Sequence, residues 1–274
     1  MTKRSPKTTL AALLAILALS ILATGCHKKQ IALAPDLASS DEALYRLGEQ
    51  YVKKDTEKAL LYLRQVIDSF PKSFYAQRAK LLIADAYFRK GDESNMILAA
   101  AEYREFIRSY PYSPSAAYSQ YQIAMTFYRK MLKPGRDPSK TIQALAEFKK
   151  VIADYPASDQ AKEAQAKIKE CEERLAGHET EIALSYHRRR AYRAAISRLS
   201  EVMSKYPDYT GLAKVYFYLG DCYFMIRQFD QAFPYFTKVV TDYPGDKLAK
   251  TATKRLADIP RLKAETPKPK VKTG

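Results

Sequence analysis

The residue with the clearest chemical signal is Cys26, because this thiol ends an apolar run near the start of the chain. Three cations precede the run at 10–22, which spans about 13 residues, whereas a membrane-spanning helix needs roughly 20. A cationic start, a short apolar middle and small residues before a cut site are typical of a secretory signal peptide. Residues 1–25 are therefore predicted to be a leader that is removed.

The stretch LATGC at 22–26 resembles the bacterial lipobox, although Ala23 stands where that motif usually has Leu. In the lipobox, signal peptidase II cuts before a cysteine that is then lipid-modified. We expect Cys26 to carry S-diacylglycerol and N-palmitoyl groups, which are enough for stable membrane anchoring. No other cofactor is expected. The alternative is an ordinary secretory leader whose cut falls near a cysteine.

The residue after Cys26 bears on location. In lipoproteins of double-membraned bacteria, an Asp at this place usually retains the protein at the inner membrane, and here it is His27. The expected location is therefore the outer membrane, with the chain lipid-anchored on the periplasmic face. Residues 26–40 then form a lipidated tether.

The remaining candidates for chemistry do not form a catalytic or metal-binding pattern. His178 and His187 are nine residues apart, so they do not share a helix face as metal ligands at i and i+4 do. No G-x-S-x-G, glycine-rich phosphate loop or H-E-x-x-H occurs. Cys171 and Cys222 either pair or remain buried free thiols, since two cysteines give no disulfide framework. We expect no catalytic residue, no metal and no enzymatic activity.

The chain is strongly basic, with a formal net charge of +16 that falls to +13 without the three leader cations. Outside the cytoplasm this charge suits anionic lipid headgroups, cell-wall polymers or acidic partner surfaces, and no nucleic acid is expected. The run HRRRAYR at 187–193 is either an anion-binding patch or a solvated helix end whose cations complement the macrodipole.

Five similar octapeptides recur along the chain, each with a proline after an amphipathic segment. Proline cannot continue a helix, so each one is expected to end a helix. The spacings of 40, 45, 51 and 37 residues are in the range of a helical repeat that carries insertions. The octapeptides are VIDSFPKS, FIRSYPYS, VIADYPAS, VMSKYPDY and VVTDYPGD, with Pro71, Pro111, Pro156, Pro207 and Pro244.

The last repeat carries the tetratricopeptide pattern, with Tyr in place of the first Trp. Gly220 and Ala232 are small enough to let two helices approach closely, and larger side chains are expected to fill the space between them. The matching positions are Tyr216, Leu219, Gly220, Tyr223, Ala232, Phe236 and Pro244.

These repeats predict an all-α protein, an α-solenoid of five tetratricopeptide-like helix pairs with a C-terminal capping helix. Repeats one to three occupy 41–158, and one long helix is expected at 159–177. Repeats four and five occupy 159–257 and end with a closing helix near 247–257. Residues 258–274 are expected to be a basic disordered tail.

The candidate binding surface is the concave side of the first three repeats, where helix A of each pair lines a groove. Aromatic side chains interleaved with cations suit an extended peptide with aromatic residues and a free carboxylate. The alternative for any one of these residues is packing between repeats. The groove residues are Tyr45, Arg78, Leu81, Phe88, Arg89, Tyr118, Tyr121, Tyr128 and Arg129.

Several stretches resemble the BamD (YfiO/ComL-like) family, outer-membrane lipoproteins of the β-barrel assembly machine. They include FPKSFYAQRAKLLIADAYFRKGD, FIRSYPYSPSAAYSQYQIAMTFY, the RDP at 136–138, YPASDQAKEAQAKI and LAGHETEIALSYHRRRAYRAAISRL. The similarity covers residues 40 to about 257. LAxHE followed by Tyr-x-x-Arg-x-Ala-Tyr is more specific than the repeat pattern alone.

The resemblance implies a scaffold without catalysis. Its front repeats would receive the C-terminal aromatic signal of unfolded outer membrane β-barrel proteins, and its back repeats would dock on the POTRA domains of the insertase BamA. The family's docking arginine falls on Arg198, and other lipoproteins of the machine are further candidate partners. The alternatives are a generic periplasmic tetratricopeptide adaptor, a peptidoglycan-associated lipoprotein, and an enzyme with an unrecognised site.

Overall fold

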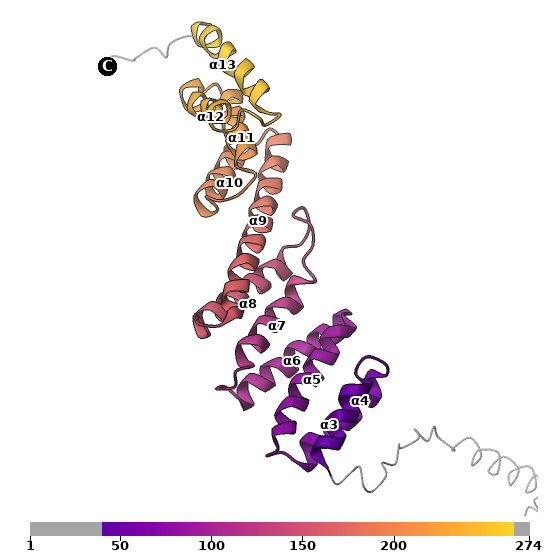
Figure 1. Ribbon diagram of the computed structural model, residues 1–274. Helices are drawn as coiled ribbons and strands as arrows, with labels where there is room; N and C mark the ends of the chain where they lie inside the picture. Colours follow the sequence, from indigo (N-terminus) through magenta and orange to yellow (C-terminus); the bar gives the residue numbers. More distant parts are fainter. Residues whose placement is uncertain (1–39, 266–274) are drawn as a thin grey trace, which may run out of the picture.

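Antiparallel pairs of helices follow one another along the computed structural model, which describes residues 40–265 (Figure 1). The pairs confirm the expected all-α solenoid of five repeats with a capping helix. The predicted leader, Cys26, the tether up to 39 and the tail from 266 lie outside the described residues. The helices are α3 Asp41–Tyr51, α4 Thr56–Ser69, α5 Phe74–Lys90, α6 Glu93–Ser109, α7 Ala116–Tyr128, α8 Ser139–Asp154, α9 Asp159–Arg188, α10 Tyr192–Lys205, α11 Leu212–Met225, α12 Phe229–Asp242 and α13 Ala249–Ala264.

Each B helix ends two residues before a repeat proline, as the octapeptides predict. The residue before the proline is always aromatic, with φ between −128° and −136°, and its N–H still bonds to the carbonyl four residues back. A following proline disfavours the helical conformation of the residue before it, so the chain leaves the helix there. These C-caps are Phe70, Tyr110, Tyr155, Tyr206 and Tyr243.

Small residues permit close contact within a pair. A Cβ atom added to Gly48 would lie 2.5 Å from Leu63 Cδ2, and one added to Gly220 would lie 3.0 Å from two ring carbons of Phe236. Both neighbours are fully buried. The glycines are therefore needed for helix A to rest against helix B in the first and fifth repeats.

The buried side chains form three clusters along the array. A front cluster spans α3 to α7, a middle cluster spans α7 to α9, and a back cluster spans α9 to α13. Helix α9 contributes Ala164, Ile168 and Cys171 to the middle cluster, and Leu175, Ala176, Ala183 and Leu184 lie buried further along it. Because one continuous helix is buried on both sides of its midpoint, it joins the front and back repeats mechanically.

Helix α9 runs for 30 residues and is longer than the helix expected at 159–177. The structure continues this helix without a break through helix A of the fourth repeat. The first half of α9 packs against α8 and the second half pairs with α10. In Figure 1 it crosses from the magenta repeats to the orange ones.

The last helix also continues past its expected end at 257. Helix α13 reaches Ala264 and contains Pro260. Ile259 is 4% exposed, and Leu262 packs against the back cluster. Burial of these side chains offsets the hydrogen bond that the proline removes. The boundary of the predicted disordered tail at 258 is therefore wrong by about two helical turns.

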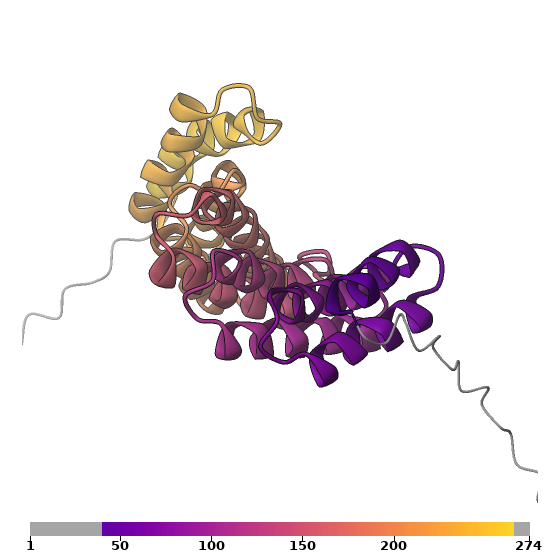
Figure 2. The same cartoon turned by 60° about the horizontal axis from the view of Figure 1, so that its bottom comes forward.

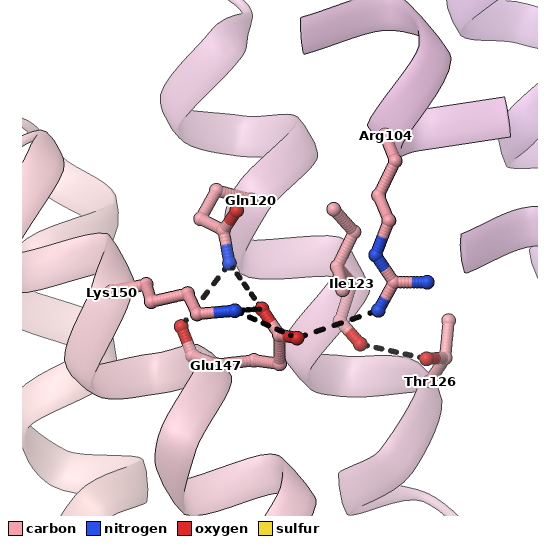
Figure 3. Close-up of polar contacts among 6 residues, drawn as sticks. All are labelled: Arg104, Gln120, Ile123, Thr126, Glu147 and Lys150. Atoms are coloured by element: carbon pink, nitrogen blue, oxygen red, sulfur yellow. Dashed lines mark hydrogen bonds and ion pairs between the residues drawn. The ribbon is translucent and has the colours of Figure 1, made fainter. Parts of the chain in front are cut away.

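A polar network joins the second and third repeats (Figure 3). Glu147 of α8 accepts a hydrogen bond from Gln120 of α7 at 2.8 Å, and its carboxylate also lies 3.2 Å from Lys150 and 3.4 Å from Arg104 of α6. Its side chain is 13% exposed. Three donors around one shielded carboxylate fix α6, α7 and α8 relative to one another. The pairs then stack into a curved array, with the back repeats turned away from the front ones (Figure 2).

Candidate functional site

The predicted groove residues lie on the A helices of the first three repeats or directly after them. Two of them are not available to a ligand. Tyr45 is 5% exposed within the front cluster, and Tyr121 is 9% exposed with its ring 5.5 Å from that of Phe148. The prediction that they line an open groove is wrong, because an A helix packs both on its own B helix and on the neighbouring repeat. Leu81 is half-buried against the front cluster.

Tyr118 is held in place by a shielded carboxylate, Asp85. Its hydroxyl donates to Asp85 Oδ1 at 2.9 Å, and the hydroxyl of Tyr103 donates to the same oxygen. Burial raises the pKa of Asp85 above its ordinary value, although both hydroxyl donors act in the opposite direction. Burial, together with the nearby Asp85 charge, raises the pKa of Tyr118 to about 12. Tyr118 is therefore a fixed part of the contact between repeats two and three.

One face of α5 carries two exposed side chains, Phe74 and Arg78, and three half-buried ones, Leu81, Asp85 and Phe88. Phe74, Arg78, Leu81, Asp85 and Phe88 are spaced by four and three residues, so they share one side of the helix. The ring of Phe74 is 67% exposed. Phe74 was not among the groove residues predicted from the sequence. The signal that could have indicated it is an aromatic side chain at the first helical position, directly after the N-cap Ser73. We call these five residues the α5 face.

Cations lie over the aromatic rings of the α5 face. The guanidinium carbon of Arg78 is 5.6 Å from the centre of the Phe74 ring and 5.0 Å from that of Tyr45. Arg129, just after α7, lies 4.6 Å from the Phe88 ring. Arg89 donates to the carbonyl of Val52 at 3.3 Å. The predicted pairing of aromatic side chains with cations is therefore present on this face.

Tyr128 connects α7 to the first half of α9. Its hydroxyl donates to Glu170, and Lys167 lies 3.1 Å from that hydroxyl and 2.9 Å from Glu170 Oε1. The Lys167 ammonium is also 4.5 Å from the centre of the tyrosine ring. The hydrogen bond with Glu170, and to a lesser extent that with Tyr128, raises the pKa of Lys167. The tyrosine is thus held between the third repeat and the long helix.

The family-specific stretch LAGHE at 175–179 holds the loop between α7 and α8. His178 Nδ1 lies 2.6 Å from the carbonyl oxygen of Pro134, so this nitrogen carries the proton, since a carbonyl only accepts. Arg174 donates to the carbonyl of Leu132 at 2.6 Å. A Cβ on Gly177 would lie 3.1 Å from Pro134 Cβ. Gly177 and His178 of this stretch, with Arg174 just before it, therefore hold the loop against α9.

Arg198 lies on α10, which is helix B of the fourth repeat, and its side chain is 45% exposed. Its Nη1 atom is 3.6 Å from Glu179 Oε2 and 4.0 Å from Glu201 Oε2. Neither distance is that of a strong charge-assisted hydrogen bond. The guanidinium therefore keeps N–H donors that these two contacts do not use.

A buried ion cluster in the back repeats was missed by the sequence analysis. Asp221, with a side chain 8% exposed, lies 2.8 Å from His187 Nε2 and 2.9 Å from Arg255 Nη2. It joins the end of α9 to α11 and α13. The guanidinium of Arg255 also lies 4.5 Å from the Phe224 ring. The sequence signal for this cluster was Asp221 itself, because a charged residue inside the apolar run of α11 must find partners when it is buried.

A pocket of about 390 Å³ lies between α9 and the turn from α10 to α11. Thr210 in this turn is held by Glu173, which accepts from its backbone N–H at 3.1 Å. The Thr210 hydroxyl also donates to a carboxylate oxygen of Glu173, and the lining combines charges of both signs with apolar surface. A lining of this kind suits a polar ligand that also has apolar surface. It is lined by Lys169, Glu170, Glu172, Glu173, Lys205, Tyr206, Pro207, Asp208, Tyr209 and Thr210.

The two cysteines of the repeats are buried free thiols, so of the two alternatives the structure shows the unpaired one. Cys171 belongs to the middle cluster and Cys222 to the back cluster. Burial raises the pKa of each thiol to about 12. Within residues 40–265, no three His, Cys, Asp or Glu side chains come together to hold a metal ion. No helix of this range is long and apolar enough to cross a membrane.

Helix pairs, repeat prolines and glycine contacts define a tetratricopeptide protein, and a tetratricopeptide family model matches residues 214–246, which contain most of α11 and all of α12. A second family model, described as outer membrane lipoprotein YfiO, matches residues 37–225. The chain therefore belongs to the YfiO family of outer membrane lipoproteins, which confirms the resemblance seen in the sequence.

Several characterised relatives are similar over most of their length. The outer membrane protein assembly factor BamD of Caulobacter vibrioides is 28% identical over 257 residues, covering 92% of this chain and 81% of that protein. The BamD of Neisseria gonorrhoeae is 30% identical over 204 residues, covering 70% and 74%. Among solved structures, the TPR2AB domain of yeast Sti1 is 13% identical with a TM-score of 0.46, covering 82% of this chain and 84% of that chain.

Proposed function

We propose that this chain is a non-catalytic adaptor for the assembly of outer membrane proteins. The observation that carries the proposal is its similarity, over most of both chains, to proteins named outer membrane protein assembly factor BamD. The described residues support a binding role. Arg129 lies over the Phe88 ring, Arg198 is half-exposed, and the pocket beside α9 is lined by charges of both signs.

In this proposal the front repeats receive unfolded outer membrane β-barrel proteins at the α5 face. Phe74 and Phe88 offer aromatic surface, and Arg78, Arg89 and Arg129 offer cations beside it. A peptide that ends in an aromatic residue would place its ring on these side chains and its terminal carboxylate on a guanidinium.

The test is fluorescence anisotropy with a labelled peptide that ends in Phe. Phe88→Leu combined with Arg129→Gln should weaken binding at least tenfold, and an amidated peptide should bind more weakly to the wild-type chain. The matched control is Leu98→Ala with Lys149→Gln, which removes one exposed apolar group and one cation on B helices. Equal affinities for all variants and for the amidated peptide would contradict the role of the α5 face.

The back repeats are proposed to dock on the POTRA domains of the BamA insertase through Arg198, with other lipoproteins of the machine as further partners. The half-exposed guanidinium and its loose contacts with Glu179 and Glu201 support this assignment. An incoming carboxylate would replace these contacts with a shorter, bidentate pair.

The proposal also includes a lipid anchor at Cys26 on the periplasmic face of the outer membrane. The support is the LATGC stretch together with membership of an outer membrane lipoprotein family. Cys26→Ala should leave an unacylated precursor that carbonate and salt extract from membranes. Retention of the variant in the carbonate-washed membrane would contradict the anchor.

A further inference from the structure

Four arginines surround the turn between α9 and α10, and none has an acidic partner among residues 40–265. Arg188, Arg189, Arg190 and Arg193 are all exposed. Elsewhere in the described chain, Arg104 and other exposed arginines lie beside glutamates. We call these four residues the arginine turn. Its charge is left for a group outside the chain.

The backbone of this turn holds an arginine where glycine is the ordinary residue. Arg190 has φ of 61°, in the left-handed region. The N–H of Ala191 bonds to the carbonyl of Tyr186 at 3.0 Å and that of Arg190 to the carbonyl of His187 at 2.9 Å, which is the Schellman ending of a helix.

The equivalent position after α5 is Gly91, with φ of 75°. A residue with a side chain is strained in this conformation. Such strain at a surface turn suggests that the side chain has a function. The turn after α11 repeats the arrangement, since Arg227 has φ of 60°. Both back repeats therefore place an arginine at the strained position of the turn that leaves helix A.

An open hollow of about 550 Å³ lies beside the arginine turn. It is lined by His187, Arg188, Arg190, Tyr192 and Met225. Met225 is 45% exposed, and the ring of His187 is fixed by its contact with Asp221. Cations next to an aromatic ring and an exposed apolar side chain are the combination found at the boundary between lipid headgroups and acyl chains.

We propose that the arginine turn binds the phosphate groups of anionic lipid headgroups, so that the back repeats rest against the leaflet. The chain belongs to a family of outer membrane lipoproteins, so a surface of lipid phosphates is its immediate environment. Guanidinium groups bind phosphate oxygens in bidentate pairs, and Met225 would contact the acyl boundary below them. An acidic protein segment would engage the arginines but would give Met225 no such contact.

The test uses residues 27–274, which contain every described residue and lack both the leader and the lipid acceptor. Vesicle sedimentation compares phosphatidylcholine alone with phosphatidylcholine mixed with phosphatidylglycerol. We expect binding only to the mixed vesicles, and we expect R188Q/R189Q/R193Q to weaken it on the order of a hundredfold. The matched control K247Q/K250Q/K254Q removes three exposed cations from the region around the start of α13 and should change binding less than threefold.

A second variant separates lipid binding from folding. Arg190→Gly removes one cation and the backbone strain together, so it should weaken vesicle binding while raising the melting temperature. The proposal is overturned if the arginine and control triple variants lose binding equally, since that shows a diffuse charge effect. It is also overturned if mixed vesicles are not preferred, or if soluble poly-glutamate binds the arginine turn while vesicles do not.

Discussion

Tyr121 and Tyr128 lie seven residues apart on the same helix, yet they have different roles. Tyr121 is buried against Phe148 of α8, whereas the hydroxyl of Tyr128 reaches Glu170 on α9. Periodicity places both residues on helix A but does not show how closely the next helices approach. The contacts of each side chain therefore decide whether it stabilises the fold or remains accessible to a ligand.

Tyr121→Ala should lower the free energy of unfolding by roughly 3–5 kcal/mol, because it leaves a cavity in the middle cluster. Tyr121→Phe keeps the ring and should cost about 1 kcal/mol or less. Urea denaturation measures both. Tyr112→Ala is the control, since this side chain is 98% exposed and its loss should change stability by less than about 0.5 kcal/mol. Wild-type stability of Tyr121→Ala would show that the ring is not packed as described.

Asp85 should make stability depend on pH in the direction opposite to that of a salt-bridged carboxylate. Its pKa is raised in the folded protein above the ordinary 3.8, so the folded state holds this proton more tightly than the unfolded state. The contribution of the group is fully present below the unfolded pKa and is lost as pH rises through the folded pKa.

Asp85→Asn removes this titration, so the variant should gain stability relative to wild type as pH rises from acidic to neutral. Urea denaturation at several pH values measures the difference, in which the other carboxylates cancel. If the variant instead loses stability relative to wild type over this range, the pKa of Asp85 is lowered in the folded protein.

At the scale of elements, α9 is the part of the fold that positions both halves. Its first half closes the middle cluster and its second half is helix A of the fourth repeat. Near its midpoint, Arg174, Gly177 and His178 hold the loop that follows α7. The helix therefore fixes the front repeats, this loop and the back repeats relative to one another.

His178→Ala should release the loop after α7 without unfolding α9. The variant loses the donor to the Pro134 carbonyl, at a cost of about 0.5–1.5 kcal/mol. Hydrogen exchange should speed up in residues 129–138 and stay unchanged in α10 and α11. Lys169→Ala, an exposed change on the same helix, is the control. Unchanged exchange in the loop would show that the histidine does not hold it.

Much of this element order could be predicted from the sequence, because the signals are local. The repeat prolines stop the B helices directly, and Gly48 and Gly220 mark close helix contacts. The full length of α9 could not be predicted, because no local signal shows that the helix expected at 159–177 continues into helix A of the fourth repeat. The buried positions of Tyr45 and Tyr121 and the Asp221 cluster depend on helices distant in sequence, which no local pattern reports.

At the scale of the whole molecule, the curved array separates two surfaces. The α5 face belongs to the second repeat and Arg198 to α10 of the fourth repeat, and Figure 1 shows α9 running between these parts of the array. In the proposed adaptor, a rigid connection of this kind would hold a client and an insertase at a fixed separation. An adaptor needs this arrangement and needs no catalytic group.

Arg198→Glu should weaken docking on BamA by on the order of 2–5 kcal/mol, if the partner carboxylate is desolvated in the complex. Binding of the purified chain to a POTRA-domain fragment, measured by calorimetry, reports the change. Lys205→Glu reverses a charge on the same helix and is the control. Arg198→Gln should keep the melting temperature of the wild type, which separates docking from folding. Unchanged affinity of Arg198→Glu would remove this residue from the docking surface.

The central claim, an adaptor of outer membrane protein assembly, is tested most directly by affinity purification of the tagged, full-length chain from detergent-solubilised envelopes, followed by mass spectrometry. The account predicts that a large β-barrel protein with POTRA domains is recovered with the wild-type chain and depleted with Arg198→Glu. Recovery of cell-wall fragments or of an export system, with no such β-barrel protein, would contradict it.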